Sequence, residues 1–165
     1  MSSHRLHVFS AMLSGTSIPR LRIKTMKRSA SAVWKGGLKD GHGSVSTETG
    51  VLREAGYGFN SRFESGPGTN PEELLGAAHA GCFSMALALA LEQAGHKAER
   101  IETRAAVSLD KDGDGFAISA IALTCRARVP GLSADQFKEL AEATKTGCPV
   151  SKALRPPISL DAALE

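Results

Sequence analysis

Residues 69–95 read TNPEELLGAAHAGCFSMALALALEQAG, and this stretch decides the fold of the chain. Thr69 or Asn70 is a good helix cap, Pro71 suits the first helical position, and glycine at 95 ends the pattern, so we predict a helix from 71 to about 94. Leu74 to Leu91 is uncharged over eighteen residues, the lower limit for a membrane span. Its internal glycine, histidine and serine, with Glu at both ends, favour instead a helix buried on most sides inside a protein core.

The region before this helix has the pattern of a small antiparallel sheet. Short extended segments cover residues 29–35, 44–49 and roughly 57–64. They are separated by glycine-rich turns at 36–37 and 41–43. Such segments with glycine between them predict a β meander.

The region after the helix begins with a predicted β-hairpin. Two alternating segments, 98–109 and 116–129, are joined by DKDGDG at 110–115. This turn resembles the first half of a calcium-binding loop, but Ile121 stands where a bidentate glutamate is needed. We therefore expect no calcium site there.

The C-terminal part predicts two more helices and a last strand. An amphipathic helix spans about 133–147, and Cys148 then caps a short helix that begins at Pro149. Two prolines end that helix, and residues 158–164 return as a strand. The fold class is therefore α+β, with antiparallel sheets packed around a long central buried helix.

Composition places residues 26–165 in one domain. The chain has 165 residues, 42% apolar and 22% charged, which is enough to bury a core. Three cysteines are too few for a disulfide framework, so we expect a cytoplasmic protein whose thiols are either core residues or reactive groups.

Residues 1–25 form a basic N-terminal extension. They contain four basic residues and no acid, whereas the rest of the chain has 16 basic and 17 acidic residues. Three interpretations remain open: a start assigned too early, with Met26 as the first residue, a disordered tail, or a transit peptide. The nearly neutral domain gives no reason to expect a nucleic-acid partner.

The three cysteines differ in their predicted surroundings. Cys125 lies in a hairpin strand and is expected to be an inert core residue. Cys148 sits at a helix start, where unpaired N–H groups favour a thiolate, so local chemistry nominates it as the reactive thiol. Cys82 lies in the apolar helix, where burial raises a thiol pKa unless a cation is nearby. His79, one turn earlier, is expected to be a hydrogen-bonded core residue, and Arg62 is the better candidate cation.

Five segments together carry a family resemblance. They are VSTETGVL at 45–52, YGFNSRFE at 57–64, GTNPEEL at 68–74, AAHAGCFSMAL at 77–87 and GCPVS at 147–151. From residue 26 onward, in their order and spacing, they resemble the OsmC/Ohr family of thiol-dependent peroxidases, and the OsmC branch more closely than the Ohr branch.

The resemblance implies a reaction and assigns roles. Cys82 would be the peroxidatic cysteine, Cys148 the resolving cysteine, and Arg62 with Glu72 the polar pair that activates Cys82, which reverses the local ranking of the thiols. The substrate would be an organic hydroperoxide and the reductant a dithiol, such as a lipoylated protein, with no cofactor and no metal. Physically, Arg62 can stabilise a thiolate in an apolar pocket, and Glu72 can hold the guanidinium.

The spacing of Glu72 and Cys82 bears on assembly. Ten residues of straight helix span about 15 Å, so these side chains meet only if the helix breaks or two subunits share the site. The resemblance implies an intertwined homodimer with active sites at its interface, and a helix this apolar agrees with that. We also expect Phe83, Met85 and Phe59 to line an apolar pocket around Cys82 that favours organic hydroperoxides over hydrogen peroxide.

Two other functions are compatible with parts of the pattern. One is a non-catalytic binding or structural protein of the same fold, with core cysteines. The other is a zinc site built from Cys82, Cys148 and His79. The zinc site is disfavoured because these residues include no closely spaced pair of ligands of the usual kind.

Overall fold

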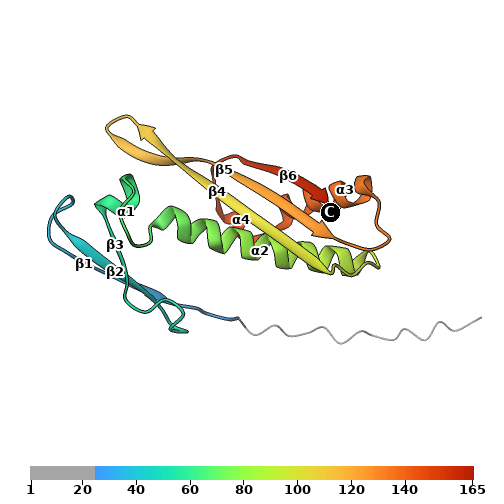
Figure 1. Cartoon of the computed structure of the whole chain (residues 1–165), viewed down its shortest axis with the longest axis horizontal. Coiled ribbons are helices and arrows are strands. Elements are labelled where there is room, and N and C mark those ends of the chain that lie inside the picture. Colours follow the sequence, from blue (N-terminus) through green and yellow to red (C-terminus); the bar gives the residue numbers. More distant parts are fainter. Residues whose placement is uncertain (1–24) are drawn as a thin grey trace, which may run out of the picture.

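The computed structural model describes residues 25–165 and contains two three-stranded sheets and four helices in that part of the chain (Figure 1). The expected basic extension therefore lies, apart from residue 25, outside the described residues. In chain order the elements are β1 (Ala30–Lys35), β2 (His42–Thr47), β3 (Ala55–Gly58), α1 (Phe59–Phe63), α2 (Pro71–Gln93), β4 (Arg100–Asp112), β5 (Gly115–Arg128), α3 (Ala134–Gly147), α4 (Pro149–Ala153) and β6 (Ile158–Leu164).

The central helix forms where the sequence predicts it. The Asn70 side chain accepts a hydrogen bond from the Glu73 amide at 2.8 Å, and Pro71 occupies the first helical position. Past the other end, Gly95 has φ +84°, a conformation that glycine adopts without strain. The predicted helix is therefore confirmed at both of its ends.

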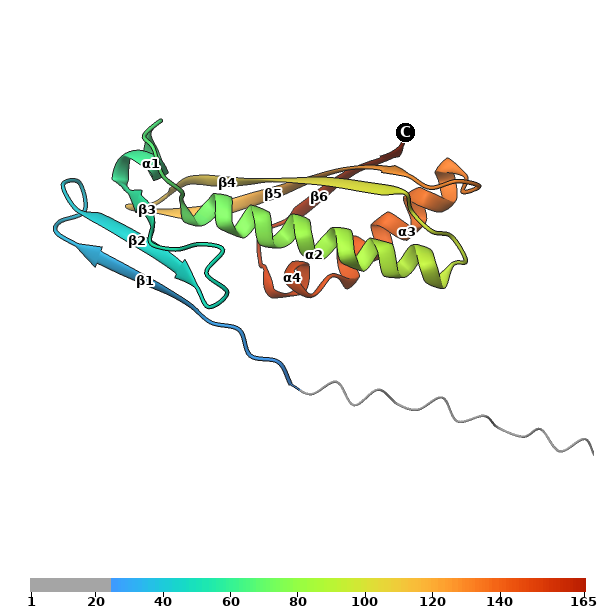
Figure 2. The ribbon, with the colours of Figure 1, turned by 60° about the horizontal axis from the view of Figure 1, so that its bottom comes forward.

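The two sheets lie at different places along this helix. The sheet β1-β2-β3 is an antiparallel meander near the start of α2, whereas β4-β5-β6 runs along the helix, with α3 and α4 beside it (Figure 2). The predicted hairpin is confirmed by the antiparallel register of β4 and β5, and both strands are long. The α+β class is confirmed as well.

Strand β6 corrects one detail of the prediction. It pairs parallel with β5, from Ile121↔Ile158 to Ala127↔Leu164, so the second sheet is mixed and not antiparallel throughout. The chain leaves β5, passes through α3 and α4, and re-enters the sheet in its original direction. Such a crossover produces a parallel pair, which a tight turn cannot.

Helix α1 corrects a second detail, because residues 59–63 were expected to continue a strand. Instead the Ser61 hydroxyl donates to the Thr69 carbonyl at 2.8 Å and accepts from the Gly58 amide at 3.0 Å, which closes one helical turn. The Phe59 and Phe63 rings pack against each other in a tilted arrangement, with 4.9 Å between their centroids. The turn places Arg62 beside the start of α2.

Burial of α2 differs from the expectation of cover on most sides. One face is buried and packs on the second sheet; it includes Phe83, Leu87 and Leu91. On the opposite face Met85 is 77% exposed and Leu89 is 56% exposed. Among the helices in residues 25–165, only α2 is long and apolar enough to cross a bilayer. The core helices of soluble proteins can meet the same criterion of length and composition. Within one chain, then, the helix is half covered.

Candidate active site

The two cysteines named from the sequence meet in the folded chain. Cys82 lies in the middle of α2, and Cys148 lies at the junction of α3 and α4. Their Sγ atoms are 3.1 Å apart, and all three cysteines of the chain are free thiols. A disulfide is about 2.05 Å long, so a small movement joins the two sulfurs. Cys148 is fully buried whereas Cys82 is partly exposed, so a molecule from solvent reaches Cys82 first.

The surroundings give the two thiols different acidities. Burial raises the pKa of Cys82, and the adjacent Cys148 raises it further. Burial also raises the pKa of Cys148, but the amide and hydroxyl of Ser151 together with Cys82 and the Val150 amide outweigh this and lower it below its ordinary value. Within one chain Cys148 is therefore the more acidic thiol, in agreement with the local chemistry of the sequence.

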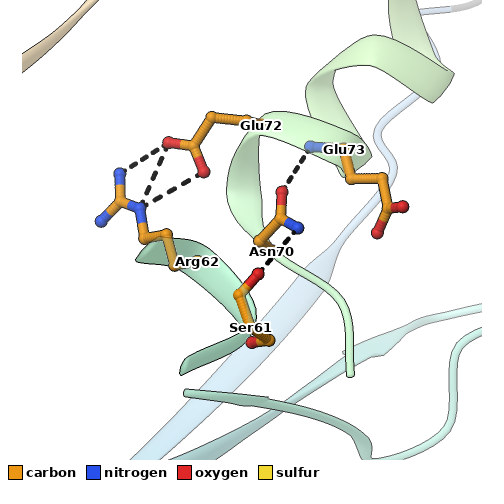
Figure 3. A network of polar contacts seen from close by, with 5 residues as sticks. All are labelled: Ser61, Arg62, Asn70, Glu72 and Glu73. Carbon is orange, nitrogen blue, oxygen red and sulfur yellow. Dashed lines mark hydrogen bonds and ion pairs between the residues drawn. The ribbon is translucent and has the colours of Figure 1, made fainter. Parts of the chain in front are cut away.

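Arg62 and Glu72 form a second polar centre. The guanidinium donates from Nη2 to Oε1 of Glu72 at 2.7 Å and from Nε to both carboxylate oxygens at 3.2 and 3.3 Å (Figure 3). Glu72 is buried and Arg62 is half-exposed, so the carboxylate serves as a fixed support for a cation that still reaches solvent.

Neighbouring contacts hold this pair in place. Asn70 caps α2 and its amide also donates to the Ser61 carbonyl at 3.1 Å, which ties α1 to the first turn of α2 (Figure 3). The guanidinium carbon lies 5.4 Å from the centre of the Phe63 ring, and that ring packs on Phe116 of the hairpin at 5.0 Å. The orientation of Arg62 is thus set from two sides.

The thiol pair and the ion pair are separated within one chain. Helix α2 is continuous from Pro71 to Gln93, so the expected distance of about 15 Å along its axis between Glu72 and Cys82 applies. Among residues 25–165 no cationic side chain lowers the pKa of the Cys82 thiol. The residues of the predicted site are all present, but within one chain they form two separate centres, the thiol pair and the ion pair.

A small apolar cavity opens beside the ion pair. It measures about 160 Å³ and is lined by Trp34, Leu38, Tyr57, Gly58, Phe59, Arg62, Phe63 and Pro71. Of the three residues expected to line a pocket around Cys82, Phe59 lines this cavity, which lies beside Arg62 and does not include Cys82. Phe83 belongs instead to the buried core, and Met85 lies on the open face of α2. The expectation was wrong for these two because α2 turns Phe83 toward the sheet and Met85 away from it.

The remaining candidates fall into core positions. Cys125 is fully buried in the cluster beneath β5, and burial raises its pKa. His79 is also fully buried, and its Nε2 lies 2.8 Å from Oγ of Ser151. In residues 25–165 no group of three or more His, Cys, Asp or Glu side chains is placed to hold a metal ion. Sequence reasoning missed Ser151, although its position three residues after Cys148 was a usable signal.

The sequence matches a family model and is similar to known proteins. Residues 64–163 match the family model for OsmC-like proteins, a range that includes Glu72, Cys82 and Cys148 and begins two residues after Arg62. The chain is 53% identical to peroxiredoxin OsmC of Escherichia coli over 137 residues, which is 83% of this chain and 96% of that protein. It is 33% identical to the organic hydroperoxide resistance protein OhrB of Bacillus subtilis over 114 residues, 68% of this chain and 82% of that protein.

Solved structures agree with this assignment. The crystal structure of OhrB from Bacillus subtilis superposes with a TM-score of 0.59 at 31% identity, covering 83% of this chain and 98% of that one. An OsmC-like protein from Mycoplasma pneumoniae superposes with a TM-score of 0.67 at 17% identity, covering 86% and 99%. The second likeness shows the fold alone.

Proposed function

The chain belongs to the OsmC-like family, and from this membership we propose that it is a two-cysteine peroxidase that reduces organic hydroperoxides in stress defence. Relatives named as a peroxiredoxin and as an organic hydroperoxide resistance protein support peroxidase chemistry. The observation that carries the mechanism is the 3.1 Å separation of the Cys82 and Cys148 sulfurs.

The first step is oxidation of Cys82. Its thiolate attacks one oxygen of the hydroperoxide, the O–O bond breaks, and the alkoxide leaves and takes a proton to become an alcohol. Cys82 retains the other oxygen as a sulfenic acid. Cys82 suits this step because it is the partly exposed thiol of the pair.

The second step closes a disulfide. The Cys148 thiolate attacks the Cys82 sulfur, the S–S bond forms, and hydroxide leaves and is protonated to water. The lowered pKa of Cys148 supplies the thiolate for this attack. A dithiol reductant, such as a lipoylated protein, then reduces the disulfide and restores both thiols. The cycle uses no cofactor and no metal, and we place it in the cytoplasm.

The ion pair acts on Cys82 from a second subunit in this proposal. The thiol pair and the ion pair of one chain lie too far apart to meet along α2, and the face of that helix bearing Met85 and Leu89 is apolar and open. In a homodimer that covers this face, Arg62 of one protomer reaches Cys82 of its partner. There the guanidinium lowers the pKa of the Cys82 thiol, against the effect of burial, which raises it.

The cavity beside Arg62 favours alkyl hydroperoxides over hydrogen peroxide. Its lining of aromatic and aliphatic side chains can bury an organic group, and each buried CH₂ contributes about 0.8 kcal/mol. We expect kcat/KM for cumene hydroperoxide to exceed that for hydrogen peroxide by roughly 100-fold, the equivalent of about 2.7 kcal/mol. Steady-state rates with a dithiol reductant measure the ratio.

One test variant and one control variant show whether the cavity causes this preference. Phe59→Ala enlarges the cavity and removes apolar surface that would contact the organic group, so it should reduce the ratio. Cys125→Ser, in the buried core cluster, should leave the ratio unchanged. Equal rates on both peroxides would contradict the preference. Absence of turnover on either peroxide would favour the second candidate, a non-catalytic protein of this fold with core cysteines.

A further inference from the structure

We propose that the buried contact between His79 and Ser151 anchors α4 on α2 and so keeps Cys148 within reach of Cys82 while Cys82 is oxidised. His79 and Ser151 are positioning residues in this proposal, because they act on the thiols through the placement of α4. The inference deepens the proposed function and rests on it for the step after oxidation. The anchor itself is a property of the fold that is testable without peroxide.

Two contacts with the same spacing join α2 to the chain around α4 (Figure 2). On α2, His79 and Cys82 are three residues apart, and across the start of α4 so are Cys148 and Ser151. His79 Nε2 is 2.8 Å from Ser151 Oγ, and the two sulfurs are 3.1 Å apart. The Lys152 amide donates to the Cys148 carbonyl at 3.0 Å, which closes the turn that carries Cys148 and Ser151. Because residues at this spacing share one face of a helix, fixing one contact fixes the other.

The contact also accounts for a histidine in the apolar core. The His79 side chain is fully buried, on the face of α2 that bears Phe83 and Leu87. A buried polar ring is costly unless it is hydrogen-bonded. Within residues 25–165 its Nδ1 has no partner, so Ser151 is the residue that pairs with the ring there. Removing either side chain leaves the other unpaired in the core, and α4 should then detach more readily.

Helix α4 depends on contacts of this kind because it is short. It has five residues, far fewer than the roughly 12–15 that an isolated helix needs to be stable. Between α2 and residues 148–153, the side-chain hydrogen bonds of the described chain are the thiol contact and His79 with Ser151. Peroxide changes the first of these, since Cys82 becomes a sulfenic acid. The second contains no sulfur and persists.

The anchor bears on two competing fates of oxidised Cys82. In one, the Cys148 thiolate attacks the Cys82 sulfur, the S–S bond forms, and hydroxide leaves and is protonated to water. In the other, the sulfenic sulfur attacks a second hydroperoxide, the O–O bond breaks, an alcohol is released and Cys82 becomes a sulfinic acid. A thiol held in place has a high effective concentration, which favours the first fate. The anchor should therefore protect Cys82 from over-oxidation.

The first test measures the disulfide equilibrium without peroxide. The protein is equilibrated with reduced and oxidised dithiothreitol, quenched in acid, unfolded, and assayed by mass for the Cys82–Cys148 disulfide. Oxidised dithiothreitol takes up the two electrons and two protons that the thiols release. Ser151→Ala and His79→Phe should each lower the equilibrium constant for disulfide formation about tenfold, because a detached α4 must be ordered again before the sulfurs meet. The reduction potential of the pair should rise accordingly by about 30 mV.

Three further variants separate the anchor from a general loosening. His79→Gln should return the equilibrium constant to within a few-fold of the parent value, because its amide both donates and accepts hydrogen bonds. The double variant of His79→Phe and Ser151→Ala should lose no more than either single variant, since both remove one contact. Ser84→Ala is the matched control. It removes another hydrogen bond of α2, from Ser84 to Thr103 at 2.8 Å, and should leave the equilibrium unchanged.

Several results would overturn the proposal. An unchanged equilibrium in Ser151→Ala is the plainest, and this variant removes a single hydroxyl, so it is decisive even if His79→Phe fails to fold. A loss of about a hundredfold in the double variant would show two independent effects, since these multiply. Equal losses in His79→Gln and His79→Phe, or a tenfold loss in Ser84→Ala, would report disturbed packing of α2.

The second test uses peroxide and rests on the proposed activity. Without added dithiol, Cys82 of Ser151→Ala should be oxidised at the parent rate. The concentration of cumene hydroperoxide that over-oxidises half of Cys82 should fall about tenfold, as measured by intact mass. Slower oxidation of Cys82 with unchanged over-oxidation would contradict the anchor. If no peroxide reacts but the disulfide equilibria shift as predicted, the proposed function fails and the anchor stands.

Discussion

Replacing Cys82 by serine is expected to abolish hydroperoxide turnover. A serine hydroxyl is not deprotonated near neutral pH and does not attack an O–O bond, so turnover falls to the uncatalysed rate. For an enzyme at the lower end of common accelerations this is a loss of roughly 10⁶-fold. Consumption of cumene hydroperoxide in the presence of excess dithiol measures the loss.

Cys148→Ser should behave differently when peroxide is added without a dithiol, since an added dithiol would itself reduce a sulfenic acid. The first equivalent of peroxide converts Cys82 to a sulfenic acid that accumulates, and further peroxide over-oxidises it. Cys125→Ser is the matched control, because Cys125 is equally a buried thiol but belongs to the core cluster under β5. Full activity in Cys82→Ser, or the absence of any oxidised Cys82 in Cys148→Ser after peroxide alone, would reject the assigned roles.

Mixed dimers should recover activity that neither parent variant has. Arg62→Ala removes the cation proposed to lower the pKa of the partner's Cys82, at a cost of roughly 10- to 10³-fold in thiolate-dependent rate. Cys82→Ser removes the nucleophile. If each site takes its cysteine from one protomer and its arginine from the other, a dimer of the two variants contains one intact site and one site that lacks both groups.

The expected recovery can be stated in advance. When equal amounts of the two chains are co-expressed, half of the dimers are mixed and each has one intact site of two, so activity should reach about a quarter of the parent level. Co-expression of two differently tagged Cys82→Ser chains is the control and should stay at background. Mixed dimers, isolated by their two tags, that show no recovery would place both groups in the same chain and reject the shared site.

Much of the fold follows from local sequence signals. The Asn70 cap, Pro71 and Gly95 delimit α2 because their preferences are local, and the alternating segments predict the β4–β5 hairpin for the same reason. The parallel pairing of β6 was not predictable in this way. Its direction depends on how α3 and α4 carry the chain back to the sheet, which no short window of sequence records.

The site shows the same division between local and long-range information. The contrast between Cys82 and Cys148 in acidity follows from their positions in α2 and before α4, and both directions were predictable. The contact between His79 and Ser151 was not predictable, because the two residues lie on different helices and are 72 positions apart in sequence. Likewise, which apolar residues of α2 face outward depends on where the sheet lies.

The most direct test of the account is the intact mass and free-thiol count of the protein after one equivalent of cumene hydroperoxide. We predict the loss of two thiols and a decrease in mass of about 2 Da, as expected for one disulfide. Peptide mapping should place that disulfide between Cys82 and Cys148, whose sulfurs are already 3.1 Å apart. An unchanged mass with three free thiols would contradict the account and make these cysteines structural residues of the core.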